Sequence, residues 1–570
     1  MSILSPAQWR EKAQAALQAQ RIDEMRQILR KAIDEHPAEA LLRNSAGNLF
    51  LRAGDIAESE AQFAQAMRLS PQSLEYRTNR AIALSSLGRN AEAIAVLAPV
   101  ETAGASDAAY CSIRGTAERG AGNKAAAAQW YDRAIRLEPN RIKALHGRAR
   151  TAIERGEPDA LARVDLALAA NQGDADLWLA RAQALDVAGN PAGARDIAEQ
   201  LVQQAPNWGE GLKFLAQLRL AAGESDFTSH YGTAMERVPQ DPNIPVAWAN
   251  ILAGLDYNAE AAEVAARARS LFPQHELFAL LEAVYAGAAG DDDRAEDIFA
   301  TLAIDTPDRW LHETRHRMRR HELERAEGLL DRLVDDDPQA IGPWALRGIL
   351  WRLTDDPREG WLHQQDGLHA LRPLHDAERI LPAAIEKLHA LHDNSPLPLG
   401  QSLRGGSQTR GLLFDRIEPE FAALHDAIFS TLEEHRSKMP PADPAHPILR
   451  HRDTPWRITG SWSVRLSGGG DYHTSHIHPQ GVVSSALYCL LPKDRGDDPQ
   501  AGWLELGRPP PDLRLDLEPI RTIEPQEAHL ALFPSTLYHG TRPFAGDRRM
   551  TVAFDVSLVQ SQLHGEATNA

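Results

Sequence analysis

The chain has 570 residues, 25% of them charged, and a formal net charge of −18. This length exceeds what one hydrophobic core normally supports, so we expect two or more domains. The acidic balance argues against a general attraction to nucleic acid or to anionic membranes, and no basic patch with interleaved aromatic residues stands out.

Two further features bear on the compartment. No run of about eighteen apolar residues is present, and the first thirty residues predict a polar amphipathic helix rather than a signal peptide. The two cysteines, Cys111 and Cys489, are too few and too far apart for a disulfide scaffold, and we expect both to be buried as small hydrophobic residues. These features favour a cytoplasmic protein without a membrane span.

Glycines recur at a fixed interval through the first part of the chain. The interval is 34 residues for Gly54, Gly88, Gly122 and Gly156, and the series continues, after a slip of one residue, with Gly189 and Gly223. Alanine-rich amphipathic runs follow each glycine, and prolines such as Pro71 and Pro139 end them. This pattern predicts pairs of antiparallel helices, and it resembles the tetratricopeptide repeat. We expect nine or ten units between about residues 5 and 375, and hence an α-helical solenoid over residues 1–375.

Stacked repeats of this kind form a groove. We expect this groove to bind an extended peptide or a partner protein. The alternatives are a homodimer formed through the repeats and a purely structural support, because the fold alone does not decide between them.

The character of the sequence changes after Leu391. A Pro/Gly-rich passage leads us to assign residues 376–410 to a linker. One or two helices follow, and then short strand-like runs bounded by turn residues, at 458–467, 482–491, 503–507, 530–534 and 550–559. Such runs predict a β-sandwich or jelly roll over residues 411–570, so the fold class is multidomain α + β.

The strand-like region also holds a cluster of metal-binding residue types. His476 and His478 are two positions apart, so on an extended strand their rings point to the same side, and His539 arrives on a later segment. Imidazoles on one β-scaffold suit Fe(II), Cu, Ni or Zn. Arg549 and Thr551 share a strand face in the same way, and an inward arginine can clamp a carboxylate. The residues thus predict a metal site beside a carboxylate site.

Six segments carry a resemblance to a family. They are Q-S-L-R-G-G-S-Q-T (401–409), H-I-H-P (476–479), S-S-A-L-Y-C-L-L-P (484–492), G-W-L-E-L-G-R-P (502–509), L-F-P-S-T-L-Y-H (532–539) and R-M-T-V-A-F-D (549–555). In this order they resemble the bacterial 2-oxoglutarate-Fe(II) oxygenases that are often fused behind tetratricopeptide repeats. The resemblance implies a double-stranded β-helix, an Fe(II) cofactor, 2-oxoglutarate as cosubstrate, and O2.

The resemblance also implies a role for individual residues. His476 and His539 would be metal ligands, and His478 takes the place where most of the superfamily has a carboxylate. Arg549 would hold the distal carboxylate of 2-oxoglutarate, with Thr551 as a hydroxyl partner. Tyr488 would add a further hydrogen bond. Two alternatives to His478 stay open, because Asp471 or Glu505 could supply the missing carboxylate.

Four neighbouring residues receive supporting roles. Arg548 alternates to the strand face opposite Arg549, so we expect it to be exposed or paired. His473 is expected at the surface or behind the ligands. Trp462 and Arg465 lie on a strand that enters the site, where each could line a substrate pocket or pack elsewhere.

The function predicted from the resemblance is hydroxylation of a peptide or protein side chain that the repeat groove presents. One alternative is a repeat scaffold whose jelly roll binds a metal without turnover. A second alternative is a dioxygenase that uses three histidines and no keto acid.

Overall fold

The structure is a computed structural model that describes residues 4–493 and 497–558. Residues 1–3, 494–496 and 559–570, which belong to the predicted domains, lie outside the described residues. The chain divides into two compact units. The first consists of Met1–Leu185 with Asp415–Ile417, and the second of Asp186–Phe414 with Glu418–Ala570.

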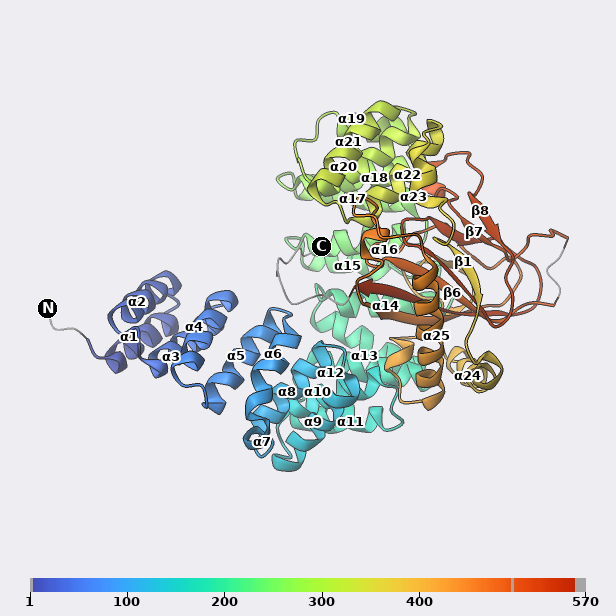
Figure 1. Ribbon diagram of the computed structural model, residues 1–570. Coiled ribbons are helices and arrows are strands. Elements are labelled where there is room, and N and C mark those ends of the chain that lie inside the picture. The colour runs from blue at the N-terminus through green and yellow to red at the C-terminus, as the bar shows by residue number, and fades with distance from the viewer. Residues whose placement is uncertain (1–3, 494–496, 559–570) are drawn as a thin grey trace. The chain divides into compact units, whose positions relative to one another are not determined.

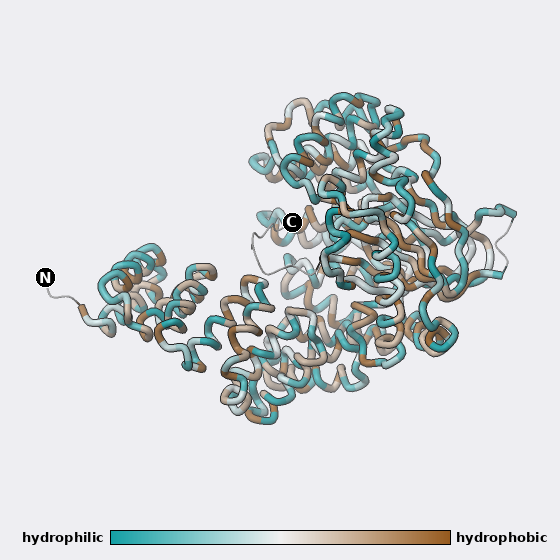
Figure 2. The backbone as a smooth tube through the Cα atoms, in the orientation of Figure 1, coloured by the Kyte–Doolittle hydropathy of each residue, from teal (hydrophilic) through white to brown (hydrophobic). Residues whose placement is uncertain are grey.

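Helices fill the first unit (Figure 1). In chain order they are α1 (Pro6–Gln18), α2 (Ile22–Glu35), α3 (Ala40–Arg52), α4 (Ile56–Leu69), α5 (Leu74–Ser86), α6 (Asn90–Leu97), α7 (Glu101–Gly104), α8 (Ala108–Gly120), α9 (Lys124–Leu137), α10 (Ile142–Glu154) and α11 (Ala160–Ala170). Hydrophobic and hydrophilic stretches alternate along them, as Figure 2 shows. Each helix therefore buries one face against its neighbours, which is how a repeat array builds a continuous core.

The repeats continue across the boundary at residue 186. The helices are α12 (Ala175–Val187), α13 (Pro191–Gln204), α14 (Gly209–Ala221), α15 (Ser229–Arg237), α16 (Asn243–Ala253), α17 (Asn258–Leu271), α18 (Glu276–Ala289), α19 (Asp292–Phe299), α20 (Pro307–Arg319), α21 (Leu323–Asp336), α22 (Ile341–Leu353) and α23 (Arg358–His363). None of the helices among the described residues is long and apolar enough to cross a membrane.

The turn between the two helices of each repeat contains one residue with positive φ. In the described chain these residues are Gln20, Gly54, Gly88, Gly122, Gly156, Gly189, Gly223, Asp256, Gly290, His321 and Asp355. They mark eleven helix pairs, whereas the sequence pattern predicts nine or ten. Four of these turn residues are not glycine, so the glycine series does not reveal their repeats, although their backbone adopts the same left-handed conformation.

The second unit also contains the β-structure, in which every pair of strands is antiparallel. One sheet has six strands in the order β1 (Ala370–Pro373), β9 (His529–Pro534), β6 (Val483–Leu490), β11 (Arg549–Leu558), β4 (Trp456–Leu466) and β3 (Ser407–Gln408). A second sheet has the order β10 (His539–Thr541), β7 (Leu504–Leu506) and β8 (Arg521–Ile523). Strands β2 (Leu403–Arg404) and β5 (Tyr472–His473) form a third. This arrangement agrees with the predicted jelly roll.

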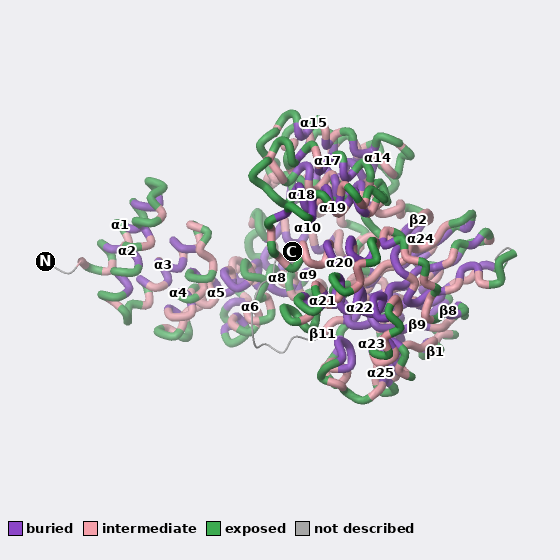
Figure 3. Tube along the Cα trace, turned by 90° about the horizontal axis from the view of Figure 1, so that it is seen from above, coloured by how far each residue is buried: buried purple, intermediate pink, exposed green. Residues whose placement is uncertain are grey.

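The large sheet is covered on both faces. On one face, Leu532 and Phe554 share a core with helices α24 (Ala377–His392) and α25 (Pro419–Lys438). On the other face, Phe533 packs with Leu504 and Leu506 of the small sheet. Buried residues lie around these layers and along α22, and also along the repeat helices (Figure 3). Cys111 and Cys489 are buried free thiols, as predicted.

The domain boundaries differ from the predicted ones. Strand β1 lies within the range assigned to the repeats, yet Ala370–Pro373 pair with Leu532–His529. Helix α24 and strands β2 and β3 lie within the predicted linker, residues 376–410. Leu381 and Leu388 of α24 enter the core of the sheet, so this helix belongs to the jelly roll. The jelly roll thus begins near residue 370, and the longest stretch of the predicted linker without helix or strand is residues 393–402.

The last repeats and the jelly roll share a hydrophobic core. Met318, Leu330 and Leu346 of the repeats pack with Leu513 and Tyr538. These repeats are therefore part of the same compact unit as the β-structure, rather than a separate scaffold.

Candidate metal centre

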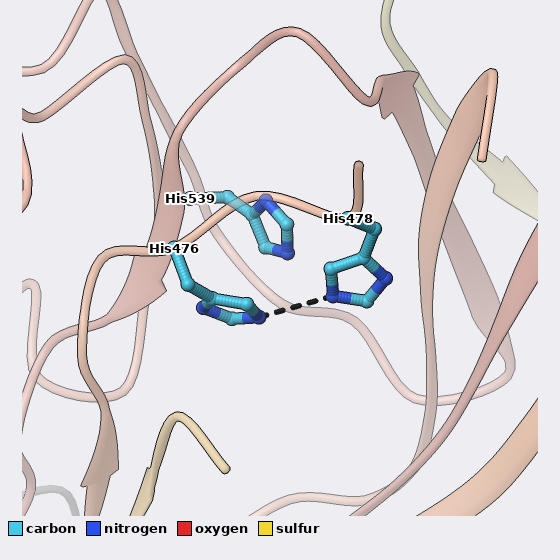
Figure 4. Close-up of side chains that lie close together, drawn as sticks. All are labelled: His476, His478 and His539. Atoms are coloured by element: carbon cyan, nitrogen blue, oxygen red, sulfur yellow. Dashed lines mark hydrogen bonds between the residues drawn. The ribbon is translucent and has the colours of Figure 1, made fainter. Parts of the chain in front are cut away.

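Three histidine side chains converge between the two larger sheets (Figure 4). Each ring of His476, His478 and His539 offers a nitrogen, and these nitrogens all lie within 4.8 Å of one another. The Nε2 atoms of His476 and His478 are 3.1 Å apart. The backbones of His476 and His539 exchange two hydrogen bonds of 3.0 and 2.9 Å, which fixes the two rings side by side.

The other nitrogen of each ring is anchored. Nδ1 of His476 donates to the carbonyl of Thr474 at 2.8 Å, and Nδ1 of His539 donates to that of Leu537 at 3.1 Å. Nδ1 of His478 donates to the carboxylate of Asp555. Because these acceptors take the Nδ1 protons, the lone pair of each ring is on Nε2, the atom that faces the other rings.

Burial keeps the two most enclosed rings neutral. It lowers the pKa of His476 to about 3, with a smaller contribution from the neighbouring His478. The pKa of His539 lies well below its usual range for the same reasons. A neutral imidazole is the form that binds a metal, so the three rings offer a donor set suited to a divalent first-row ion.

Strand β11 supplies one wall of the cavity that holds the three rings. This cavity, called here the histidine cavity, has a volume of about 600 Å³. Arg549, Thr551, Ala553 and Asp555 line it, because alternate residues of a strand share one face. Arg549 is buried, with 3% of its surface exposed, whereas Arg548 is exposed, as predicted.

The structure does not bring the two alternative carboxylates to the histidines. Asp471 accepts a hydrogen bond from the backbone nitrogen of Ser467 at 2.8 Å and does not line the cavity. Glu505 forms ion pairs with Arg508 at 2.6 Å and Arg542 at 3.5 Å. Within residues 4–493 and 497–558, the three histidines are the one group of His, Cys, Asp and Glu with the spacing of a metal site.

Tyr488 lies beneath the predicted clamp. Its ring is fully buried, and the guanidinium carbon of Arg549 lies 5.3 Å from the ring centre. The ring does not line the histidine cavity. The hydrogen bond from Tyr488 to a keto acid therefore stays a prediction.

Other predicted neighbours divide between the cavity and the surface. Trp462 lines the cavity, and its ring centre is 5.6 Å from that of His478. Arg465 forms an ion pair with Asp393 at 3.0 Å instead. His473 also lines the cavity, where Nδ1 is 3.1 Å from Oγ of Ser402.

Three features of the site do not follow from the sequence reasoning. Asp555 could have been found, because it continues the alternation that begins at Arg549. Ser402, whose Oγ is 3.2 Å from Nε2 of His476, lies in the passage assigned to the linker. Ala253 and Gly254, at the end of repeat helix α16, also line the cavity, and no sequence signal links them to the histidines.

The repeats also contact the site from behind. Ile477, between two of the histidines, packs against the core formed by α20 to α22. Arg315 of α20 donates to the hydroxyl of Tyr538 at 3.0 Å, one residue before His539. The same arginine pairs with Asp512 at 2.6 Å. The repeats thus help to fix the segments that carry the histidines.

Comparison with protein families gives matches to both parts of the chain. Residues 460–555 match the family described as "Putative 2OG-Fe(II) oxygenase". Residues 10–73, 78–142 and 175–218 match families described as "Tetratricopeptide repeat". No curated protein matches the sequence.

Solved structures resemble the chain at low identity. A tetratricopeptide repeat protein from Parabacteroides merdae is 17% identical over 43% of this chain and 97% of its own, with a TM-score of 0.36. PilF of Pseudomonas aeruginosa is 18% identical over 37% and 96%, with a TM-score of 0.33. Yeast Tom70 is 13% identical over 62% and 98%, with a TM-score of 0.30.

The family matches coincide with the two kinds of structure in the chain. The matches to the tetratricopeptide repeat fall on helix pairs, and the oxygenase match spans β4 to β11 and includes all three histidines. The chain therefore combines tetratricopeptide repeats in its N-terminal region with a C-terminal region that matches the family described as "Putative 2OG-Fe(II) oxygenase".

Proposed function

We propose that the protein is an Fe(II)- and 2-oxoglutarate-dependent oxygenase that hydroxylates a side chain of a peptide or protein. The observation that carries this proposal is the set of three converging Nε2 atoms beside a buried arginine on the wall of the same cavity. The family match supports the same chemistry.

The donor set fits iron. His476, His478 and His539 would hold the ion through Nε2, because each Nδ1 is already engaged by a carbonyl or carboxylate. Imidazole nitrogens bind Fe(II) well, and hydrogen bonds at Nδ1 orient such ligands. Asp555 brings a negative charge next to the ligand set, although it is not one of the three ligands.

Arg549 and Thr551 would hold the keto acid. A guanidinium binds a carboxylate through two parallel hydrogen bonds, and burial strengthens such a contact. Thr551 adds a hydroxyl two residues along the same strand face. When bound, iron and 2-oxoglutarate supply activation of O2, decarboxylation of the keto acid to succinate and CO2, and transfer of one oxygen atom to a C–H bond.

Apolar side chains close part of the cavity to water. The ring of Phe533 lies 4.7 Å from that of His539, and Leu504 lines the same wall. Excluding water protects reactive species from side reactions and strengthens the charged contacts of Arg549. The polar part of the lining, which includes Gln401 and Gln480, would then face the substrate.

The repeats would bind the substrate protein. Tetratricopeptide repeats are modules of protein–protein interaction, and the first unit contains a hollow of about 700 Å³, called here the repeat hollow. Residues from α5, α8 and the start of α10 line it, including Asn79, Ile82 and Thr116. A substrate held there would be present at a high effective concentration near the iron.

A turnover assay tests the proposal. Purified protein is supplied with Fe(II), 2-oxoglutarate and ascorbate, and succinate is measured. Succinate formation that needs all components is the expected result, and proteins that copurify should gain 16 Da. Consumption of O2 without succinate would favour the alternative of a three-histidine dioxygenase that uses no keto acid. The observation behind this alternative is that the group of possible ligands among the described residues contains no carboxylate. Absence of both succinate and O2 consumption would favour a scaffold that only binds metal.

A further inference from the structure

A segment of the chain itself is bound by repeat helix α14. This segment, residues 395–404, is called here the strap. The side-chain amide of Gln217 donates from Nε2 to the carbonyl of Leu397 at 2.7 Å and accepts from the backbone nitrogen of Leu399 at 2.8 Å. One carboxamide thus satisfies a donor and an acceptor of the same backbone stretch, in which Pro396 and Pro398 lack an N–H.

The strap contacts the next repeats as well. The side chain of Leu399 is buried among residues of α14, α15 and α16, such as Leu212 and Tyr231. Nε of Arg404 donates to Oδ2 of Asp256, in the turn after α16, at 2.6 Å. The strap also passes close to the end of α16, since a Cβ added at Gly254 would lie 2.8 Å from Cα of Gly400. The strap is therefore held by an apolar anchor and polar contacts on consecutive repeats.

Gln217 occupies a repeat position that elsewhere lines the repeat hollow. It precedes the turn glycine Gly223 by six residues. Ile82 and Thr116 precede their own turn glycines by six residues, and both line the repeat hollow of the first unit. The position that is open in the first unit is thus engaged by the chain's own strap in the second.

The strap leads directly into the histidine cavity. Gly400, Gln401, Ser402 and Arg404 all line it. Oγ of Ser402 lies 3.2 Å from Nε2 of His476, the atom that would face the metal. A shift of the strap on the repeats would therefore move a wall of the cavity.

We propose that repeats α14 to α16 bind the strap as a ligand in cis, so that this part of the array builds the substrate-facing wall of the cavity instead of offering a groove to a substrate. Gln217 is then a positioning residue that acts through the strap. The repeat hollow of the first unit is then the place where the repeats would bind an extended polypeptide of another molecule. The claim that the wall faces a substrate rests on the proposed function, whereas the binding of the strap does not.

Hydrogen–deuterium exchange of the full-length chain tests the proposal. Gln217→Ala removes both hydrogen bonds, and Gln217→Glu keeps an acceptor for the backbone nitrogen of Leu399 but loses the donor to Leu397. We expect the amides of residues 399–404 to exchange about tenfold faster or more in Gln217→Ala, and by a smaller factor in Gln217→Glu. Lys213→Ala, an exposed change on the same helix, is the matched control and should leave the exchange of the strap unchanged.

The outcomes are separable. Unchanged exchange of the strap in both Gln217 variants, with an unchanged melting temperature, would overturn the proposal. If Gln217→Ala does not fold, the comparison of Gln217→Glu with Lys213→Ala shows whether the strap exchanges faster, as proposed, or unchanged, which would overturn the proposal. Faster exchange of the strap combined with no succinate from the wild-type protein would refute the proposed oxygenase function and leave the inference about the strap intact.

Discussion

The carboxylate of Asp555 accepts a hydrogen bond from Nδ1 of His478, although 77 residues separate them in the chain. This contact fixes the ring of His478 and leaves Nε2 as the nitrogen that would bind a metal in the proposed site. A carboxylate behind an imidazole also makes the imidazole a stronger donor. The three rings thereby have a carboxylate beside them, the group that a set of two histidines and one carboxylate would contain as a ligand.

Removal of this carboxylate should weaken metal binding. We expect Asp555→Ala to lower the affinity for Fe(II) or Co(II) about 10- to 100-fold. Asp555→Asn, which keeps an acceptor oxygen without the charge, should have a smaller effect. Competition with a fluorescent chelator measures the affinity. Asp471→Ala is the control, because that carboxylate binds a backbone nitrogen away from the histidines. A larger loss in Asp471→Ala would show that the assignment is wrong.

Each proposed ligand should be needed for binding. His476→Ala and His539→Ala should abolish stoichiometric binding of iron, because two imidazoles alone leave the ion weakly held. Metal analysis of the purified protein after gel filtration provides the measurement. His529→Ala serves as control, since Nδ1 of that ring donates to the carbonyl of Glu527 and the residue does not line the histidine cavity. Retention of one iron per chain in both ligand variants would contradict the site.

The keto-acid clamp predicts a contrast between adjacent arginines. Arg549→Ala should raise the concentration of 2-oxoglutarate needed for half-maximal succinate formation by a factor equivalent to about 2–4 kcal/mol, the cost of removing one partner of a buried charged pair. Iron should still bind. Arg548→Ala should have little effect, because Arg548 is exposed. Equal effects from the two variants would mean that the clamp is misassigned.

Stability should fall in mild acid. Burial lowers the pKa of His392 and of His435 to about 3 and that of His446 to about 4, from 6.5. These rings are neutral in the folded chain and become charged on unfolding below pH 6.5. The contribution of these rings to the free energy of unfolding is therefore fully present above pH 6.5. It is lost as the pH falls toward 3 to 4, by about 1.4 kcal/mol per pH unit for each ring.

Urea unfolding at pH 6.5 and pH 5 measures this loss. The decrease in the free energy of unfolding between pH 6.5 and pH 5 should be about 2 kcal/mol smaller in His435→Gln than in the wild type, because glutamine takes up no proton on unfolding. His425→Gln, on the same helix but partly exposed, is the comparison variant. The same pH dependence in wild type and His435→Gln would contradict the assignment of His435 as a buried neutral ring.

Substrate delivery by the first unit predicts a selective defect. Replacing Ile82 and Thr116 together by arginine fills the repeat hollow with two charges, so hydroxylation of the protein substrate should be lost while iron binding and slow succinate formation without substrate persist. Mass spectrometry of the substrate measures the hydroxylation. Glu11→Arg, exposed on α1, adds a charge outside the hollow and should leave hydroxylation intact. An unchanged kcat/KM in the double variant would show that the repeat hollow has no role in substrate delivery.

The sequence predicts the helix pairs from local periodicity, whereas the histidine cluster is predicted from the spacing of His476 and His478 together with the resemblance that adds His539. The turn glycines report the repeat directly, and the alternation of a strand explains why Arg549 is buried and Arg548 exposed. The glycine series misses the repeats in which Gln20, Asp256, His321 and Asp355 take the left-handed turn position, because the sequence does not mark these residue types as turn residues.

Long-range contacts account for what the sequence does not predict. The strap contains prolines and glycines typical of a linker, yet its conformation is set by Gln217, which is distant in the chain. Helix α24 likewise lies in the range that the sequence assigns to the linker, because its apolar side chains gain a partner only when the sheet is assembled. Such pairings depend on which surfaces meet in three dimensions.

Strand β1 links the end of the repeats to the edge of the large sheet, and this has a practical consequence for the design of shorter fragments of the protein. A fragment that starts after residue 375 would lack β1 and leave the backbone of β9 without its outer partner. That bared strand contains Leu530, Ala531 and Leu532, and an unprotected apolar edge is a template for aggregation. A fragment that retains the jelly roll should therefore begin well before Ala370 and include the last repeats, which share its core, and fragments cut after residue 375 should precipitate.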